Sequence, residues 1–332
     1  IALYLDAEHN ITDKLMVAGA VRFENYSDFG NTTTGKLSMR YDPSRQVGIR
    51  GSVSTGFRAP GVQQKFYSSV STNLNSAGVL TETLTAREGS AVTKAFGIAP
   101  LKEETSKNAS IGMVLRPATN FSVTADLYRI DIDDRIVFSS EINSSKCVVD
   151  SPACPIRQIL DPLHVGQAQF FTNAIGTTTK GLDIVAEHTT KWPGSTLVLS
   201  GQLGFNRTKV TDRNSSSPVL TGDMLFDAAQ VTLIERGQPR QHHVVAADYS
   251  AGPWNLNARA NYYGEVQGQG FSPLQTWDAK WLVDMTARYS FTKRLSVSVG
   301  VNNVFDTYPS KWDKSPDFQN MGFVYCWETC PI

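Results

Sequence analysis

The stretch VSTGFRAPGVQQKFYSS, residues 53–69, begins with the alternation of a β-strand and then breaks abruptly. Up to Phe57 its apolar residues alternate with small polar ones, as in a strand with one apolar and one polar face. The segment RAPG at 58–61 then stops any strand or helix, and no clear period follows up to residue 104. We interpret this break as the point where a strand leaves one environment and enters another.

The bulk composition excludes several classes of protein. The 332 residues carry 31 basic and 31 acidic side chains, so the net charge is zero, without the excess of positive charge that is typical of nucleic-acid binding. No window of about 18 apolar residues predicts a transmembrane helix. The chain opens directly on IALYLDAEH without a signal peptide, which indicates either a cytosolic protein or a fragment of a longer one.

Alternation of apolar and polar residues recurs along almost the whole chain. It is clear in LMVAGAVRF at 15–23 and in WNLNARANYY at 254–263. Most of the predicted strands are longer than the about five or six residues that are common in soluble proteins, and they reach the about nine to eleven of a tilted membrane strand. We predict twelve strands, near residues 1–9, 15–25, 34–42, 46–57, 105–116, 121–133, 168–190, 195–208, 241–251, 253–266, 279–291 and 295–305.

The connections between these strands alternate between short and long. The short ones lie at 10–14, 43–45, 117–120, 191–194, 252 and 292–294; the long ones lie at 26–33, 58–104, 134–167, 209–240, 267–278 and from 306 onward. Outer-membrane barrels have this asymmetry, with short periplasmic turns and long extracellular loops. A soluble sandwich is the alternative, but it has no reason to place every long loop at one end.

Aromatic residues gather near the strand ends, where a barrel has its two interfacial girdles. Enrichment of aromatics in any strand is the simpler explanation, but their positions favour girdles. Those beside short turns are Phe121, Trp192, Trp254 and Phe291, and those near long loops are Phe23, Phe57, Tyr262, Trp281 and Phe305.

Several segments resemble, in the correct order, the signatures of TonB-dependent outer-membrane receptors. STGFRAPGVQQ is similar to the family's strand-to-loop motif, and LKEETSKNASIGMVLRP with NFSVTADLYRIDIDDRIV resembles its K-x-E-x-S strand and the hairpin after it. TNAIGTTTKGLDIVAEH is similar to its N-x-G-x-x-x-x-G strand, and LSVSVGVNNVFD to its N-N-hydrophobic-F-D segment. The resemblance covers almost the whole chain.

The resemblance implies an all-β fold, an antiparallel transmembrane β-barrel of 22 strands around a plug, in the outer membrane of a Gram-negative bacterium. Neither a plug nor a TonB box is found in the chain, and CWETCPI is not a closing aromatic strand. We therefore expect a single partial barrel domain over residues 1–332, truncated at both ends, whose twelve strands are the tenth to twenty-first. Its long extracellular loops lie near 58–104, 134–167, 209–240 and 306–332. A closed twelve-stranded barrel is the alternative, but it would place both termini outside the cell.

The four cysteines form two close pairs, Cys147 with Cys154 and Cys326 with Cys330. Local disulfides in an oxidising compartment fit this spacing, and we predict one within each outer loop. Free thiols and zinc ligands are the alternatives. Neither pair has the short gap that is typical of zinc ligands, and His164 is the only histidine near either.

No catalytic motif is present, and we expect neither an enzyme, a cofactor nor a bound metal. His242 and His243 begin a strand, where neighbouring side chains point to opposite faces, so they should not share a metal. The acidic run Asp131, Asp133 and Asp134 lacks the glycine and glutamate of a calcium loop and is expected to place charge at the outer rim.

The expected function is that of a receptor that binds a scarce nutrient, most plausibly a ferric siderophore, and imports it with energy relayed by TonB through a plug outside this chain. Arginine and aromatic side chains suit an anionic, ring-bearing ligand, although rim charges can also simply hold loops in place. Outer-membrane lipid is the other expected partner. A passive or structural barrel is the alternative function. The candidate ligand-lining residues are Arg22, Arg58, Phe66, Tyr67, Asn206, Tyr263 and Asp284.

Overall fold

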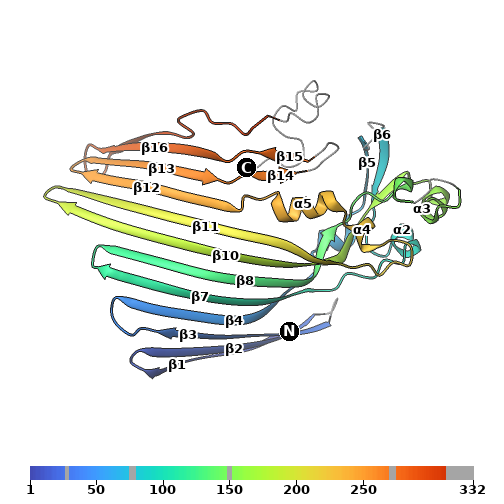
Figure 1. Ribbon diagram of the computed structural model, residues 1–332, viewed down its shortest axis with the longest axis horizontal. Coiled ribbons are helices and arrows are strands. Elements are labelled where there is room, and N and C mark those ends of the chain that lie inside the picture. The colour runs from blue at the N-terminus through green and yellow to red at the C-terminus, as the bar shows by residue number, and fades with distance from the viewer. Residues whose placement is uncertain (27–29, 75–79, 148–151, 269–273, 312–332) are drawn as a thin grey trace.

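The computed structural model describes residues 1–26, 30–74, 80–147, 152–268, 274–311 of the chain. One 12-stranded antiparallel sheet dominates it, and its strands lie side by side in the order in which they occur along the chain (Figure 1). β1 and β17 form the two edges of this sheet, so the sheet is open. Within the described ranges, no helix combines the length and the apolar character needed to cross a bilayer.

The twelve predicted strands are all confirmed, and their pairing follows the simplest possible path from each long strand to the next. The strands of this sheet are β1 (Ala2–Thr12), β2 (Leu15–Tyr26), β3 (Gly30–Tyr41), β4 (Val47–Arg58), β7 (Glu104–Ala118), β8 (Phe121–Phe138), β10 (Phe171–Trp192), β11 (Ser195–Arg213), β12 (Gln241–Ala251), β13 (Trp254–Tyr263), β16 (Lys280–Ser290) and β17 (Ser296–Val301). The predicted all-β antiparallel fold is therefore confirmed.

The two ends of the sheet differ in the way the sequence predicts. Short turns connect the strands at one end, which we call the turn end, on the left of Figure 1. Longer segments with helices connect them at the other end, which we call the loop end. Its elements are α1 (Val62–Phe66), β5 (Ser69–Leu74), β6 (Leu80–Thr85), α2 (Ala91–Ala95), η1 (Ser144–Lys146), α3 (Pro155–Leu160), η2 (Asp161–Leu163), β9 (Gln167–Gln169), α4 (Gly222–Leu225), α5 (Ala228–Arg236), β14 (Val266–Gly268) and β15 (Gln275–Trp277).

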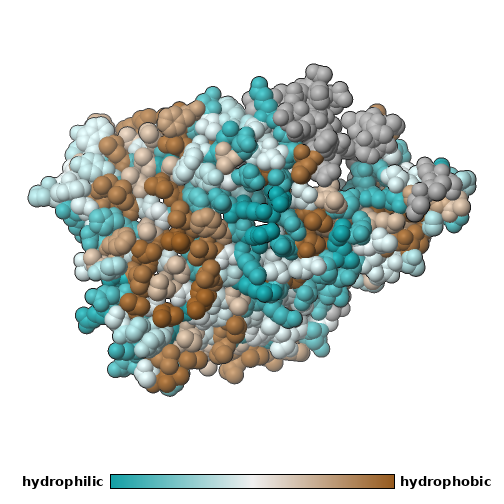
Figure 2. Space-filling view, in the orientation of Figure 1, coloured by the Kyte–Doolittle hydropathy of each residue, from teal (hydrophilic) through white to brown (hydrophobic). Residues whose placement is uncertain are grey.

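One face of the sheet is apolar and the other polar, because the strand register pairs apolar residues with apolar residues on neighbouring strands. Leu37 lies opposite Val53, Ile111 opposite Leu127, and all four side chains are more than half exposed on what we call the apolar face. The residues between them form the polar face. Figure 2 shows hydrophobic residues gathered over the strands nearer the turn end and hydrophilic residues over their part nearer the loops.

Two of the long strands reach well past their predicted C-terminal ends. β8 continues to Phe138 and β11 to Arg213, well past their expected ends at 133 and 208. Bulges around Ile175 and between Gly176 and Thr177 interrupt the alternation in β10, and a bulge shifts which face each following side chain takes. The extended ends pack Val137 and other side chains against α5 rather than continuing a simple two-faced strand.

The loop end holds the main hydrophobic core of the described residues, which we call the loop cap. Phe96 and Phe170 are almost fully buried with ring centroids 6.3 Å apart, although 74 positions separate them in the sequence. The sequence shows no clear period after residue 58, yet short helices and strands form in this region. Its helices are only one or two turns long, too short to show a 3.6-residue period. The buried residues of the cap are Ala86, Val92, Phe96, Ile142, Cys154, Ile156, Leu160, Ala168, Phe170, Leu220 and Leu225.

The disulfide predicted between Cys147 and Cys154 is confirmed, with the two Cα atoms 6.0 Å apart. Cys154 is itself a buried member of the cap and precedes α3. The bond therefore fixes the start of α3 against the core. The second predicted pair, Cys326 with Cys330, lies outside the described residues.

We expect the double substitution of Cys147 and Cys154 by serine to lower the free energy of unfolding of the loop cap by about 2–3 kcal/mol, the chain-entropy value for so short a loop. Limited proteolysis should cleave the segment around α3 faster, while far-ultraviolet circular dichroism of the sheet stays unchanged. Alkylation of both cysteines in the unreduced wild-type protein would contradict the bond itself.

Candidate functional site

Charged side chains on the polar face of the sheet are paired across strands. Arg50 of β4 reaches over Gly112 of β7 to Asp126 of β8, with Nε–Oδ1 and Nη2–Oδ2 distances of 2.9 and 2.5 Å. A Cβ atom on Gly112 would overlap the Asp126 carboxylate and meet Arg50 at 2.9 Å. The absence of a side chain at this glycine is therefore what allows the bidentate pair to form.

A buried carboxylate closes the loop end of the same face. Glu104 is almost fully buried, accepts two hydrogen bonds from the guanidinium of Arg58 and a third, of 2.7 Å, from the backbone N–H of Ile136. This contact joins β4, β7 and β8 where the strands meet the cap. The guanidinium of the predicted ligand residue Arg58 is thus occupied by a structural partner.

A small pocket of 150 Å³ opens at the loop end beside β13 and β16. Tyr263 provides an aromatic wall above the buried ring of Trp277, and Lys280 and Asp278 provide one charge of each sign. The ring of Tyr263 stacks on that of His242 with centroids 4.7 Å apart, which fixes its orientation. Tyr308, from the segment after β17, completes the aromatic lining. Aromatic faces beside an ammonium group suit a ring-bearing, anionic ligand.

Of the other predicted ligand residues, three are engaged within the sheet. Arg22 pairs with Glu24 at 2.7 Å, and Asn206 donates to the backbone oxygen of Pro239 at 3.4 Å. Asp284 accepts from the backbone N–H of Asn303 at 2.8 Å. These side chains are distributed over β2, β11 and β16, so the structure does not bring them into one cluster.

Phe66 and Tyr67 lie at the end of α1, and both are more than half exposed. They point away from any core of the described residues and could meet a ligand only from the loop side. Tyr263 is the one predicted residue that lines the pocket. Trp277 was missed because 267–278 reads as a polar loop. Lys280 lies at the start of the predicted strand 279–291 and was not selected, although it lies directly opposite Tyr263 in the strand register.

The acidic run ends up in ion pairs near the loop end. Asp131 pairs with Arg129 at 2.8 Å, Asp133 with Lys107 at 3.7 Å, and Asp134 with Lys102 at 2.7 Å. The described ranges contain no group of three or more His, Cys, Asp or Glu residues arranged to hold a metal ion.

The histidine pair behaves as the alternation predicts. His242 stacks on Tyr263 of the polar face, while His243 stacks on Tyr262 of the apolar face with centroids 5.1 Å apart. Tyr262 in turn contacts Trp281, so His243 belongs to an aromatic cluster on the apolar face near the loop end.

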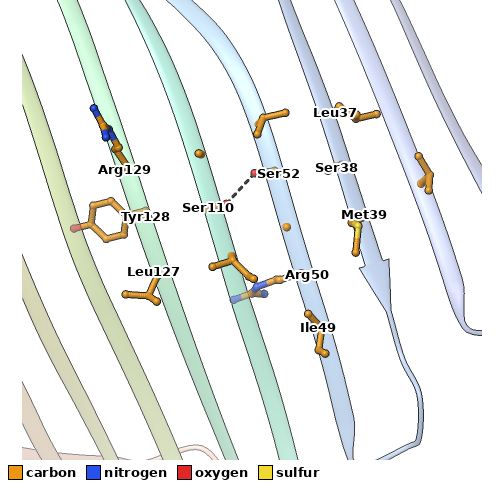
Figure 3. Close-up of a pocket in the computed structure, with 15 residues that line it drawn as sticks. Leu37, Ser38, Met39, Ile49, Arg50, Ser52, Ser110, Leu127, Tyr128 and Arg129 are labelled. Carbon is orange, nitrogen blue, oxygen red and sulfur yellow. Dashed lines mark hydrogen bonds between the residues drawn. The ribbon is translucent and has the colours of Figure 1, made fainter.

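A larger hollow, of 690 Å³, lies on the apolar face, away from the polar pocket. Leu37, Met39, Ile49 and Leu127 surround it (Figure 3). The hydrogen bond of 2.9 Å between Ser52 and Ser110 joins β4 and β7 behind it (Figure 3). Its lining is mainly apolar, with Arg129 among the few charged residues, and it faces away from the polar pocket, so we do not assign the hollow to nutrient binding.

Asp227 anchors α5 to the loop cap above the polar face. Its carboxylate caps the helix by accepting from the N–H groups of Ala229 and Gln230, and it accepts from the Lys146 ammonium at 2.9 Å. Burial alone would raise the pKa of Asp227, but Lys146, the Gln230 amide and the Ser140 hydroxyl together hold that pKa below its ordinary value.

Comparison with known proteins identifies the relatives of this chain. A family model described as TonB dependent receptor-like, beta-barrel matches residues 1–304. The vitamin B12 transporter BtuB of Vibrio vulnificus is 24% identical over 306 residues, which are 92% of this chain and 38% of the transporter. The chain therefore spans well under half of that relative.

Two solved structures show the same fold. A variant of the ferric enterobactin receptor PfeA of Pseudomonas aeruginosa superposes with a TM-score of 0.63 at 16% identity, over 92% of this chain and 39% of the receptor. The siderophore receptor PirA of Acinetobacter baumannii superposes with a TM-score of 0.61 at 16% identity, over 92% of this chain and 41% of the receptor.

Substitution of Gly112 by alanine should break the pair between Arg50 and Asp126, because the new methyl group occupies the place of the carboxylate. We expect a loss of about 1 kcal/mol or less in the free energy of unfolding, since both groups are partly exposed. When Gly112→Ala is already present, adding Arg50→Gln should lower the free energy of unfolding by almost nothing further. Gly201→Ala, where an added Cβ meets nothing within 4 Å, is the matched control in thermal unfolding. Additive effects of Arg50→Gln and Gly112→Ala would contradict the geometry.

The loop cap should loosen in acid through Asp227. Because folding lowers this pKa, the carboxylate stabilises the cap fully above its ordinary value of 3.8, and the contribution is lost as the pH falls through the lowered pKa. Hydrogen-exchange protection of α5, corrected for the intrinsic exchange rate, should therefore fall below about pH 4. Asp227→Asn retains the helix cap but not the charge, so the variant should show no such transition. An identical transition in both proteins would assign it to another group.

Proposed function

Because the chain belongs to the TonB-dependent receptor family, whose barrel model matches residues 1–304, we propose that it is part of an outer-membrane receptor of a Gram-negative bacterium. This receptor binds a scarce nutrient and imports it with energy relayed by TonB. Twelve long strands with one apolar face, and connections that are short at one end and long at the other, support a membrane barrel.

The chain forms a part of the barrel rather than a closed one. Its sheet has two edges, and the sheet covers about two fifths of the receptors that share its fold. Lipid does not tolerate unpaired strand edges, so further strands pair with β1 and β17 in the whole receptor. The matched family model describes a barrel, and we infer that other parts of the whole receptor contact TonB.

The nutrient is a ferric siderophore, and the pocket beside Tyr263 contributes to its site. The observation that carries this assignment is the combination of the rings of Tyr263 and Tyr308 with the ammonium of Lys280, above the buried Trp277, at the loop end of the polar face. The same combination suits the aromatic, anionic groups of an iron chelate through stacking and charge. One similar structure is a complex of PfeA with enterobactin, and PirA is named a siderophore receptor.

Cobalamin is the second candidate nutrient, because a relative by sequence is a vitamin B12 transporter. It has no comparable anionic ring system for Lys280 to recognise, so the charge dependence of binding separates the two candidates.

We expect Tyr263→Ala and Lys280→Gln, made in the full-length receptor, each to weaken binding of a ferric catecholate siderophore by about tenfold, or about 1.4 kcal/mol. Tyr249→Ala, on the apolar face of the neighbouring strand, is the matched control and should bind as the wild type does. The measurement is fluorescence or radiolabelled iron binding to the purified receptor, with cobalamin in parallel.

Uptake by cells with and without functional TonB decides between an energised receptor and a passive barrel. Iron accumulation that stops without TonB supports the proposed import, whereas equal accumulation identifies a passive pore. If the receptor binds cobalamin but no siderophore, and Lys280→Gln leaves that binding unchanged, the nutrient is cobalamin and not a siderophore.

A further inference from the structure

Basic side chains interrupt the apolar face just where it approaches the loop end. The register aligns Arg129 of β8 directly with Lys180 of β10, and Lys180 with Arg207 of β11. One step nearer the loops, Lys107 and Lys209 lie in the next row with Asp131 and Thr178 between them. We call these five basic residues the basic rows. All five are exposed.

The row immediately on the turn side of them is entirely apolar. It consists of Ile111, Leu127, Leu182 and Phe205, one residue from each of the same four strands. Successive rows on one face are about 7 Å apart, because every second residue returns to that face. The positive charge therefore begins within one row of the apolar band.

The arrangement is electrostatically unfavourable without a partner. Like charges directly opposite each other on neighbouring strands repel, and Arg129, Lys180 and Arg207 place three in line. The nearest acidic residues are Asp131, within the second row, and Asp133, one row further toward the loops, and they are engaged by Arg129 and Lys107. Five cations against two carboxylates leave an excess of three positive charges. Within the part of the chain that the structure describes, Lys180, Arg207 and Lys209 have no ion pair.

The field of this region extends to the neighbouring loop. Burial, together with the positive charges of Arg236 and Arg207, lowers the pKa of Arg240, which lies just before β12. The structure thus holds several cations close together at the loop end although the chain as a whole is neutral.

The basic rows also border a continuous depression in the apolar face. A hollow of 620 Å³ is lined by Lys107, Arg129 and Asp131 at its loop side. It shares Ala109, Leu37 and Val53 with the larger apolar hollow of 690 Å³ on the turn side. An anionic group at the basic end and a hydrocarbon chain along the apolar end would fill both.

We propose that this surface binds a phosphate-bearing lipid of the outer leaflet, with its phosphate at Arg129, Lys180 and Lys107 and an acyl chain in the apolar hollow. Guanidinium and ammonium groups are the usual partners of phosphate, and Arg129 can add a phosphate oxygen to its pair with Asp131. The assignment rests on the proposed orientation, in which the loop end lies outside the cell. A free anion would neutralise the positive charges but would leave the apolar hollow empty. The basic rows beside an apolar hollow therefore favour a lipid.

The test uses the full-length receptor, delipidated in neutral detergent and titrated with phosphatidic acid, phosphatidylcholine or inorganic phosphate. We expect phosphatidic acid to bind at least about tenfold more tightly than phosphatidylcholine. The triple variant K107Q/R129Q/K180Q should lose this preference, whereas R45Q/K191Q/R294Q, which removes the same charge at the turn end, should retain it. Far-ultraviolet circular dichroism establishes that both variants are folded.

A filling substitution separates a lipid from a free anion. Ala109→Trp blocks the junction of the two hollows beside Arg129 and leaves the charges intact, so it should weaken phosphatidic acid several-fold. The proposal is wrong if inorganic phosphate displaces phosphatidic acid at a concentration equal to that of the lipid. It is also wrong if the triple variant and the wild type bind the lipid equally well. Siderophore binding is measured on the same samples. If the wild-type receptor binds phosphatidic acid but no siderophore, the proposed nutrient is wrong and the lipid site stands.

Discussion

The hydrogen-bond ladder between neighbouring strands is the constraint on which the rest of this molecule depends. Each long strand pairs with the next long strand along the chain, so the backbone groups of the ladders find their partners only a short turn or one loop away. A slip of one residue in any pair would move the apolar side chains of that strand to the polar face. The chemistry of both faces, and every cross-strand contact described above, follows from this single register.

Much of the sheet can be predicted from the sequence because alternation is a local signal. LMVAGAVRF and WNLNARANYY each reveal a strand without reference to any other segment. The loop cap cannot be predicted in this way, because Phe96 and Phe170 become neighbours only when two distant connections fold together. Its helices are too short for a period, and α5 was therefore taken for loop.

The candidate pocket shows a similar limit. Tyr263 could be selected from its place at the end of an alternating strand, whereas Trp277 could not, since it lies in a short strand between polar residues. Arg58 and Asp284 have the residue types of ligand-binding groups, yet Glu104 and the Asn303 amide occupy them. Residue type thus identifies what can bind, and only the neighbours of a side chain decide whether it is available.

The loop cap and the sheet are stabilised by different forces, and temperature acts on them differently. Burial of Phe96, Ile156 and Leu160 depends on the hydrophobic effect, which weakens on cooling. The sheet has no such core, since large side chains such as Leu37 and Val53 remain exposed on its apolar face, and its strands are held by backbone hydrogen bonds. Cold therefore loosens the loop cap before it affects the sheet, although the Cys147–Cys154 bond limits how far α3 can separate from its neighbours.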